Sequence, residues 1–336
     1  MRLLVTGGAG FIGSRLVRGV LGDEYPTLAG ASVTVLDNLS YSGNEANLQP
    51  VADHPRLRFV RGDIRDAALV DGLLPGHDAI VHCAAETHVD RSLTEGDPFV
   101  TTNVVGTQVL LEAAVRHGSP RFVHVSTDEV YGSISAGAWT EDAPLVPSSP
   151  YSATKAAADL LTLAYHRSYG LPVTVTRCTN NFGPYQFPEK IIPLFVTNLL
   201  DGLTVPLYGD GGNVRDWLHV DDHCRGLALA LAGGRPGEIY HLGGGTELAN
   251  RDLTALLLQA CGAGRDRVRQ VADRKGHDRR YALDWAKAEA ELGYRPRVDF
   301  RPALLATVDW YRGNRPWWEP LRYRVAASRG ADSGTG

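Results

Sequence analysis

Tyr151 and Lys155 stand four positions apart in a stretch with helical periodicity, so we expect them on one helix face about a turn apart. A phenol has a pKa near ~10 and is a poor base at neutral pH. A nearby ammonium group favours the phenolate and lowers that pKa. The pair could therefore take a proton from an alcohol while hydride leaves the same carbon. The same spacing also occurs by chance in surface helices.

A second polar cluster, Ser126-Thr127-Asp128-Glu129, follows an apolar run that predicts a strand. In open α/β sheets, ligands bind at the carboxyl ends of strands, where the Thr127 hydroxyl could bridge Tyr151 and a substrate hydroxyl. Repulsion between two adjacent carboxylates raises the pKa of one of them, which yields an acid and a base at one pH. The alternative is a solvated acidic turn, which the apolar strand and the following Tyr131-Gly132 disfavour.

A glycine-rich loop, Gly7-Gly8-Ala9-Gly10-Phe11-Ile12-Gly13, joins the first predicted strand to the first helix. Glycines let such a loop turn tightly and approach a pyrophosphate, which the N–H groups and dipole of the helix start attract. Asp37 ends the second strand, where a carboxylate accepts a ribose 2′-hydroxyl and repels a 2′-phosphate. The sequence therefore predicts bound NAD. Asp63, after the third strand, is a candidate for the adenine amine or for a helix N-cap.

Short apolar segments alternate with helical patterns through the first half of the chain. This alternation predicts an α/β fold with a Rossmann-type, doubly wound parallel sheet. Strands are predicted at 2–6, 33–37, 57–61, 79–83, 121–126 and 173–177. Helices are predicted at 12–21, 66–74, 102–117 and 151–169.

The rhythm changes after Arg177. We predict an ordered loop at 180–190, a strand at 238–242, and helices near 191–200, 221–232, 252–261 and 302–311. The interpretation is an NAD-binding Rossmann domain at 1–178, to which 220–242 crosses back, and a smaller mixed C-terminal substrate domain at 179–325. The small, polar segment 326–336 is predicted to be a disordered tail.

Composition argues against several partners. The net charge of −4 gives no electrostatic reason to expect nucleic acid or an anionic membrane. No run approaches the ~20 apolar residues of a membrane span, and the start of the chain lacks a basic-then-apolar leader. The four cysteines, Cys83, Cys178, Cys224 and Cys261, form neither a CxxC pair nor a zinc spacing. We predict a cytoplasmic protein with reduced thiols and no metal.

Taken together, these motifs resemble the dTDP-glucose 4,6-dehydratases of the extended short-chain dehydrogenase/reductase superfamily. The resemblance runs from Met1 to about Trp310. It rests on the segments 82–92, 126–132, 149–155, 180–190, 215–218 and 276–282. The Thr127-Asp128-Glu129 triplet is the most specific of these, since sugar-nucleotide epimerases and decarboxylases of the superfamily generally lack that acid pair.

The resemblance implies a reaction on dTDP-glucose in which NAD takes hydride from C4 and NADH returns it to C6. Tyr151 would be the base for the 4-hydroxyl, tuned by Lys155 and Thr127. Glu129 would remove the C5 proton, and Asp128 would protonate the departing C6 hydroxyl. The product would be dTDP-4-keto-6-deoxyglucose.

The resemblance also implies contacts and assembly. Cofactor contacts would be Gly7, Gly10, Phe11, Ile12, Gly13, Asp37, Asn38, Ser40, Asp63, Ile64, Ala84, Ala85, Thr102, Tyr151, Lys155 and Asn181. Contacts to the nucleoside diphosphate sugar would be Thr87, Thr127, Asn180, Lys190, Ile191, Pro206, Tyr208, Arg215, Asn250, Asp273 and His277. Lys190 and Arg215 supply the fixed cations that a diphosphate needs. A homodimer would form through helices like 102–117 and 151–169.

Two other functions compete with this interpretation. A related sugar-nucleotide epimerase needs the Tyr151–Lys155 pair but no elimination acid and base, and Asp128 and Glu129 speak against it. A non-catalytic NAD-binding sensor on the same fold is expected to have lost Tyr151 or Lys155, and both are present.

Overall fold

The computed structural model describes residues 1–118 and 120–330. A seven-stranded parallel sheet, ordered β10-β6-β5-β4-β1-β2-β3, forms its centre. Its strands are β1 (Arg2–Thr6), β2 (Ser32–Asp37), β3 (Leu57–Arg61), β4 (Ala79–His82), β5 (Arg121–Thr127), β6 (Val173–Cys178) and β10 (Ile239–Leu242). The chain adds strands on one side of β1 and then on the other, so ligands are expected where the order reverses, between β1 and β4. The predicted Rossmann-type fold is confirmed.

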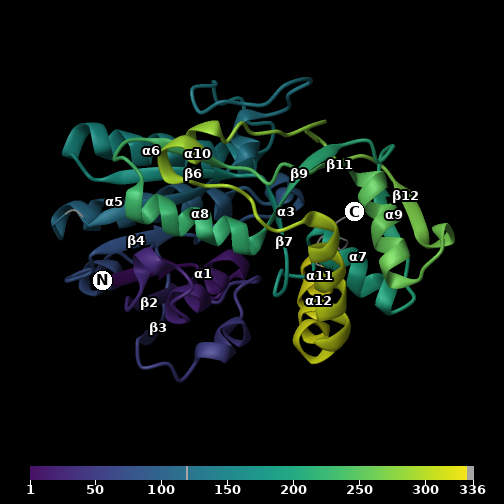
Figure 1. Ribbon diagram of the computed structural model, residues 1–336, viewed down its shortest axis with the longest axis horizontal. Helices are drawn as coiled ribbons and strands as arrows, with labels where there is room; N and C mark the ends of the chain where they lie inside the picture. The colour runs from purple at the N-terminus through teal and green to yellow at the C-terminus, as the bar shows by residue number, and fades with distance from the viewer. Residues whose placement is uncertain (119, 331–336) are drawn as a thin grey trace.

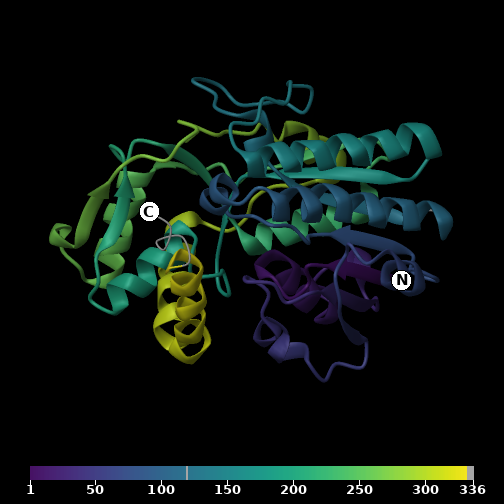
Figure 2. The same cartoon turned by 180° about the vertical axis from the view of Figure 1, so that it is seen from behind.

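Two helical layers cover the sheet (Figures 1 and 2). On one face α1 (Phe11–Leu21) packs beside α8 (Val220–Gly233), and their apolar sides join the sheet in one core. On the other face lie α2 (Ala67–Leu73), α5 (Thr107–Arg116) and α6 (Pro150–Tyr169), which share a second core with the sheet. The inner strands are therefore buried on both faces, as their largely apolar sequences require, whereas the edge strand β3 is partly exposed.

Helix α6 begins and ends where its sequence dictates. The Ser149 hydroxyl accepts the N–H of Ser152, whose hydroxyl in turn accepts the N–H of Ser149, a reciprocal capping box. Pro150 occupies the first helical position, where its missing N–H costs nothing. Gly170 ends the helix in the left-handed conformation, with φ of 68°. These signals fix the first turn of α6, which carries Tyr151.

A second group of elements packs beside the sheet's carboxyl edge (Figure 1). It contains the sheets β11-β9-β7 and β12-β8. Their strands are β7 (Asn180–Phe182), β8 (Val205–Tyr208), β9 (Val214–His219), β11 (Glu247–Ala249) and β12 (Val268–Val271). The helices are α7 (Ile191–Leu200), α9 (Asn250–Cys261), α11 (Phe300–Gly313) and α12 (Arg315–Gly330). Their apolar faces enclose a separate core around Phe195, Leu253 and Trp318.

Shorter helices complete the described chain. They are η1 (Pro26–Leu28), η2 (Glu45–Val51), α3 (Val89–Thr94), α4 (Asp97–Phe99), η3 (Val100–Gly106), η4 (Asp128–Tyr131), η5 (Arg265–Arg267) and α10 (Ala286–Leu292). No helix among the described residues is long and apolar enough to cross a membrane.

The structure differs from the sequence-based expectations in several places. The strands β8, β9, β11 and β12 and the helix α12 were not predicted. The helix predicted at 102–117 begins as the π-helix η3 before α5. The loop predicted at 180–190 contains β7, which pairs with β9. The tail prediction is wrong for 326–330, which continue α12, while 331–336 lie outside the described residues. Helix α10 packs on the first core through Ala288, although its sequence position is within 179–325.

Candidate active site

A cavity of about 690 Å³ lies at the carboxyl ends of the sheet strands, between the sheet and the second group of elements. Residues after β1, β2, β4, β5 and β6 form one wall, and residues from α7, β8, α9 and the segment after β12 form the other. Every residue that the sequence singled out for catalysis or binding lines this cavity except Asp63 and Asp273.

The glycine loop leaves no room for side chains. Gly7 has φ of +68°, and a Cβ added there would lie 2.6 Å from the backbone nitrogen of Ala84. A Cβ on Gly13 would lie 2.2 Å from the carbonyl oxygen of Gly7. Gly10 precedes α1 in an extended conformation. The first-turn N–H groups of α1 have no partner within the helix, so this end of the cavity suits a pyrophosphate.

Gly13→Ala is expected to disrupt this loop, because the added methyl overlaps the Gly7 carbonyl. Overpacking of this kind costs about 1–3 kcal/mol of unfolding free energy, and the displaced loop should weaken NAD binding at least tenfold. Denaturant titration and calorimetric titration with NAD measure the two effects. Gly72→Ala is the matched control, since a Cβ there meets nothing within 4 Å. Unchanged NAD affinity in Gly13→Ala would contradict the placement of the pyrophosphate.

The Asp37 carboxylate is fixed at the end of β2. It accepts the N–H of Ala9 at 2.9 Å and that of Leu39 at 2.8 Å. Burial raises the pKa of Asp37, and these two donors oppose that rise. A buried carboxylate with both oxygens held in place suits the two hydroxyls of a ribose.

Asp63 does not line the cavity. Its partial burial acts to raise its pKa, but hydrogen bonds from Arg65 and Asn38 lower the pKa to about 2. The N-cap of α2 is Asp66, so the alternative reading of Asp63 as that cap is wrong. Asp63 instead fixes Asn38, which does line the cavity.

Thr127, Asp128 and Glu129 stand where β5 ends and η4 begins. The Thr127 hydroxyl donates to Asp128 Oδ1 at 3.2 Å and accepts the Glu129 N–H at 3.3 Å. The other carboxyl oxygen, Asp128 Oδ2, is buried and has no hydrogen-bond partner among the described residues, as is also true of Ser126 Oγ and Asn180 Oδ1. All three residues line the cavity. Buried polar atoms in this state mark positions that a polar ligand would satisfy.

The two carboxyl groups have different surroundings. Burial raises the pKa of Asp128 well above its ordinary value, and Glu129 raises it further. Burial also raises the pKa of Glu129, but cations on Lys190, Arg215 and Arg274 oppose that rise. Of the pair, Asp128 is therefore the group that holds a proton, and Glu129 is the one that the cations favour as a carboxylate.

Tyr151 and Lys155 both face the cavity from α6. The Lys155 ammonium donates to the Val125 carbonyl of β5 at 2.7 Å. The expected lowering of the Tyr151 pKa is wrong for the protein alone: burial raises that pKa well above 10, and Glu129 raises it further. A buried phenol that faces carboxylates stays neutral until positive charge is brought near it.

The opposite wall holds the candidates for a nucleotide diphosphate. Arg215 of β9 is buried, its guanidinium donates to the carbonyls of Val214 and Asp278, and it lies 4.3 Å from the ring centre of Tyr281. Lys190 donates to the Thr87 carbonyl at 2.7 Å. Arg215 is thus held by neutral carbonyl oxygens, which leaves its charge available to an anion, whereas Lys190 also lies 3.9 Å from the Glu189 carboxylate.

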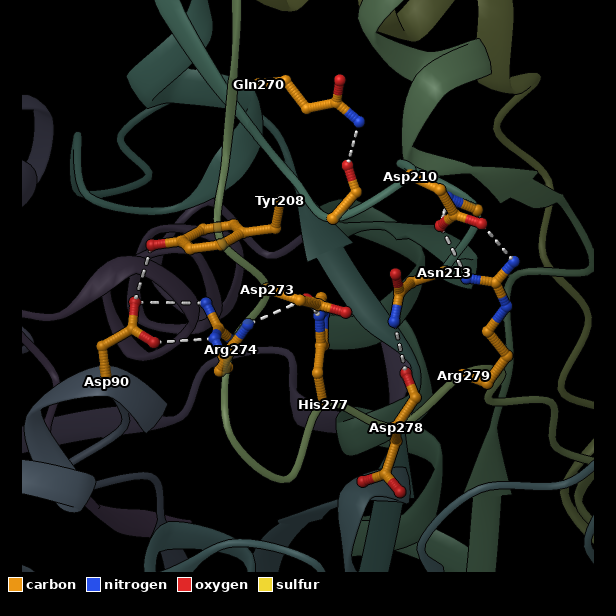
Figure 3. A network of polar contacts seen from close by, with 12 residues as sticks. Asp90, Tyr208, Asp210, Asn213, Gln270, Asp273, Arg274, His277, Asp278 and Arg279 are labelled. Atoms are coloured by element: carbon orange, nitrogen blue, oxygen red, sulfur yellow. Dashed lines mark hydrogen bonds and ion pairs between the residues drawn. The ribbon is translucent and has the colours of Figure 1, made fainter.

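Arg274 is a cavity residue that the sequence reasoning missed, although it stands between the two predicted contacts Asp273 and His277. Figure 3 shows its guanidinium beside the Asp90 carboxylate and below the Tyr208 ring. Its Nε lies 2.7 Å from Asp90 Oδ1, and its charge lies 5.2 Å from the Tyr208 ring centre. Because Asp90 belongs to α3 and Arg274 to the segment after β12, this ion pair joins the two walls of the cavity.

Asp273 does not line the cavity, and its role is indirect. Its carboxylate lies 2.6 Å from His277 Nδ1 and so fixes the imidazole that does line the cavity. The same segment is held further along by the Asp210–Arg279 ion pair, at 2.8 Å, and by a hydrogen bond from Asn213 to the Asp278 carbonyl, at 3.1 Å (Figure 3).

Comparisons with known proteins identify the family of this chain. A family model described as GDP-mannose 4,6 dehydratase matches residues 4–306. A curated dTDP-glucose 4,6-dehydratase from Streptomyces antibioticus is 65% identical over 337 residues, covering 100% of both chains. The chain belongs to the dTDP-glucose 4,6-dehydratase family. A solved dTDP-glucose 4,6-dehydratase, DesIV from Streptomyces venezuelae with NAD bound, has 66% identity and a TM-score of 0.95, covering 96% of this chain and 100% of its own.

The fold is shared beyond the dehydratase family. UDP-glucose 4-epimerase from Thermotoga maritima has 33% identity and a TM-score of 0.85, covering 93% of this chain and 99% of its own. A dehydratase and an epimerase can therefore share this architecture, and the side chains in the cavity must decide between them.

Proposed function

We propose that this chain is an NAD-dependent dTDP-glucose 4,6-dehydratase, a hydro-lyase that converts dTDP-glucose into dTDP-4-keto-6-deoxyglucose. The observation that carries the proposal is that Asp128, which is buried, and Glu129, which is half-buried, lie with Tyr151 in one cavity. Epimerisation at C4 needs no such pair, whereas elimination of water needs both an acid and a base. The 65% identity to a named dehydratase supports the same choice.

NAD fits the glycine-loop end of the cavity. The cradle at Gly7 and Gly13 excludes a Cβ, and the fixed Asp37 carboxylate suits an unphosphorylated ribose. When bound, NAD would supply a reversible two-electron oxidation at the sugar, accepting hydride from C4 and returning it to C6. The remaining predicted cofactor contacts line the same region, Asp63 excepted.

The protein's own groups handle the protons. Tyr151 takes the proton of the 4-hydroxyl, with Thr127 and Lys155 beside it in the cavity wall. Once C4 is a ketone, the C5 proton is acidic, and Glu129 removes it. Asp128, which holds a proton, delivers it to the departing C6 hydroxyl.

The substrate would be held as a nucleoside diphosphate sugar. Lys190 and Arg215 line the cavity, and fixed cations of this kind suit a diphosphate. Arg274 lies in the same cavity, but its charge is paired with Asp90. The thymine base is inferred from the dTDP-glucose dehydratases that the chain resembles, and from no single contact in the cavity.

The homodimer is also a proposal. Val100, Val105 and Leu160 are exposed apolar side chains on η3 and α6, two segments that pack against each other. A second copy of the chain would cover this face and produce a concentration-dependent mass of two chains in light scattering. A cytoplasmic location stays a prediction from the sequence.

A panel of nucleoside diphosphate hexoses tests the substrate assignment. We expect dTDP-glucose to lose one water in the presence of NAD, measured by mass spectrometry, with UDP-glucose and GDP-mannose converted at least tenfold more slowly. No net NADH should build up, because the reaction is redox-neutral. Preferential conversion of GDP-mannose would contradict the assignment of dTDP-glucose as the substrate. Steady formation of one NADH per product would show a simple dehydrogenase instead of a dehydratase.

A further inference from the structure

Arg177 is a buried arginine of β6 that lies behind the active site. Its side chain is 2% exposed, and it does not line the cavity. Its Nε donates to Asp159 Oδ2 at 2.8 Å, and one of its terminal nitrogens donates to the Tyr131 hydroxyl. Its charge also lies 4.7 Å from the Tyr131 ring centre. One guanidinium therefore contacts two different elements at once.

Those two elements carry the two halves of the proposed chemistry. Asp159 belongs to α6, one turn after Lys155, and α6 also carries Tyr151. Tyr131 belongs to η4, which also carries Asp128 and Glu129. Neither Asp159 nor Tyr131 lines the cavity. Arg177 thus joins α6, which carries the residues for oxidation, to η4, which carries the residues for elimination, and it does so outside the cavity.

The Tyr131 end of this link is itself fixed. Because Tyr131 accepts from Arg177, its hydroxyl proton is free to donate to His241 Nε2 at 2.7 Å. His241 Nδ1 lies 2.8 Å from the Asp284 carbonyl, to which it can donate. Burial lowers the pKa of His241 to about 3, so the ring is neutral and this arrangement satisfies both nitrogens. The Tyr131 ring also stacks on Trp139, with centres 5.8 Å apart.

The contact between Arg177 and Asp159 balances a buried negative charge one helical turn from Lys155. Asp159 is fully buried and lies 3.3 Å from His124 Nε2 of β5. Burial lowers the pKa of His124 to about 4, so this ring is neutral and does not balance the carboxylate. Arg177 balances it instead. Without that guanidinium, the Asp159 charge would act on Lys155 alone, and Lys155 would be drawn away from the cavity.

We propose that Arg177 is a positioning residue for the dehydration, a proposal that rests on the proposed function. Through Asp159 and Tyr131, it holds α6, with Tyr151 and Lys155, in a fixed position relative to η4, with Asp128 and Glu129. The two contacts serve different steps. The Asp159 contact keeps Lys155 directed at the site of oxidation. The Tyr131 contact keeps the acid and base directed at the site of elimination.

Tyr131→Phe separates the two contacts, because it removes the hydroxyl and leaves the Arg177–Asp159 pair. Misplacement of reacting groups by about 1 Å can cost ~10²-fold in rate, so we expect water loss to slow by about ten- to a hundredfold while C4 oxidation stays within about twofold. In a single turnover with NAD and dTDP-glucose, reduced cofactor should therefore accumulate far above the wild-type level. Tyr240→Phe is the matched control. Tyr240 lies on the neighbouring strand β10, outside the cavity, and its hydroxyl donates to Glu291.

The control separates positioning from loss of stability. Tyr131→Phe and Tyr240→Phe should both lower the midpoint of thermal unfolding, and only the first should accumulate reduced cofactor. Equal slowing of both steps in Tyr131→Phe, no slowing, or the same accumulation in Tyr240→Phe would overturn the proposal. A wild-type protein that does not remove water from the sugar would instead refute the proposed function.

The Asp159 contact is tested by charge. Arg177→Met leaves the Asp159 carboxylate unbalanced and is expected to slow C4 oxidation, with a lower midpoint of thermal unfolding. The double variant Arg177→Met/Asp159→Asn removes both charges and should recover at least tenfold of the lost oxidation rate and part of the lost midpoint, since a buried pair is often replaceable as a unit. If Arg177→Met does not fold, the double variant alone decides: oxidation within tenfold of wild type supports charge balance, and oxidation as slow as in a Lys155→Met control contradicts it.

Discussion

Tyr151→Phe should lower the rate of C4 oxidation by about 10²–10⁴-fold, the usual effect of losing a general base. The substitution removes one oxygen and keeps the ring, which packs edge-on against Phe99 with centres 6.4 Å apart. Because burial already keeps Tyr151 neutral, the fold does not depend on its charge. NAD affinity and the free energy of unfolding should therefore change little, and the loss should appear in the formation of reduced cofactor in a single turnover.

Tyr165→Phe provides the control on the same helix. Its hydroxyl lies 3.4 Å from Glu112 and does not line the cavity, so its turnover should stay within about twofold of wild type. Near-normal turnover in Tyr151→Phe would contradict the role of Tyr151 as the general base. A loss of the same size in Tyr165→Phe would show that removing a tyrosine hydroxyl from α6 impairs the structure, so the effect in Tyr151→Phe could not be assigned to proton transfer.

Glu129→Gln should leave oxidation largely in place and slow water loss by at least ~10²-fold, because glutamine keeps the shape and the hydrogen bonding but removes the base. Reduced cofactor should form with substrate and persist. The wild-type rate of elimination should fall as pH drops through the Glu129 pKa, which burial raises, since protonation removes the base. That acidic limb should be absent in Glu129→Gln.

Single-turnover absorbance and mass spectrometry measure the two steps of this variant separately. Asp128→Asn is the companion variant, since it keeps Glu129 but removes the proton for the leaving hydroxyl. Because the two carboxyls titrate as a coupled pair, their pH profiles belong to the pair. Elimination at the wild-type rate in Glu129→Gln would pass the role of base to another residue.

The strands and helices of the Rossmann part were predictable because local and global signals agree. The centres of β1 and β4 are apolar runs, Leu3–Val5 and Ala79–Val81, as burial on both faces demands. The capping box and Pro150 define the start of α6 in the sequence itself. A glycine loop between strand and helix has few uses, so its position already indicates a dinucleotide.

Other features depend on partners far away in the sequence. The three residues of β7 form a strand only because β9 lies beside them. The Arg274–Asp90 ion pair joins residues from the two walls of the cavity, and no local sequence pattern predicts it. The pKa of Tyr151 follows from burial and from the charge of Glu129, so reasoning from the helical neighbour Lys155 alone gave the wrong direction.

Conversion of dTDP-glucose in heavy water tests the central claim, that this cavity eliminates water rather than inverting a hydroxyl. The dehydratase account predicts a product lighter than the substrate by one water and carrying one solvent deuterium at C5, because the proton removed by Glu129 is replaced from solvent when hydride reaches C6. NADH should not accumulate. A product of unchanged mass, epimeric at C4 and without deuterium at C5, would contradict the account.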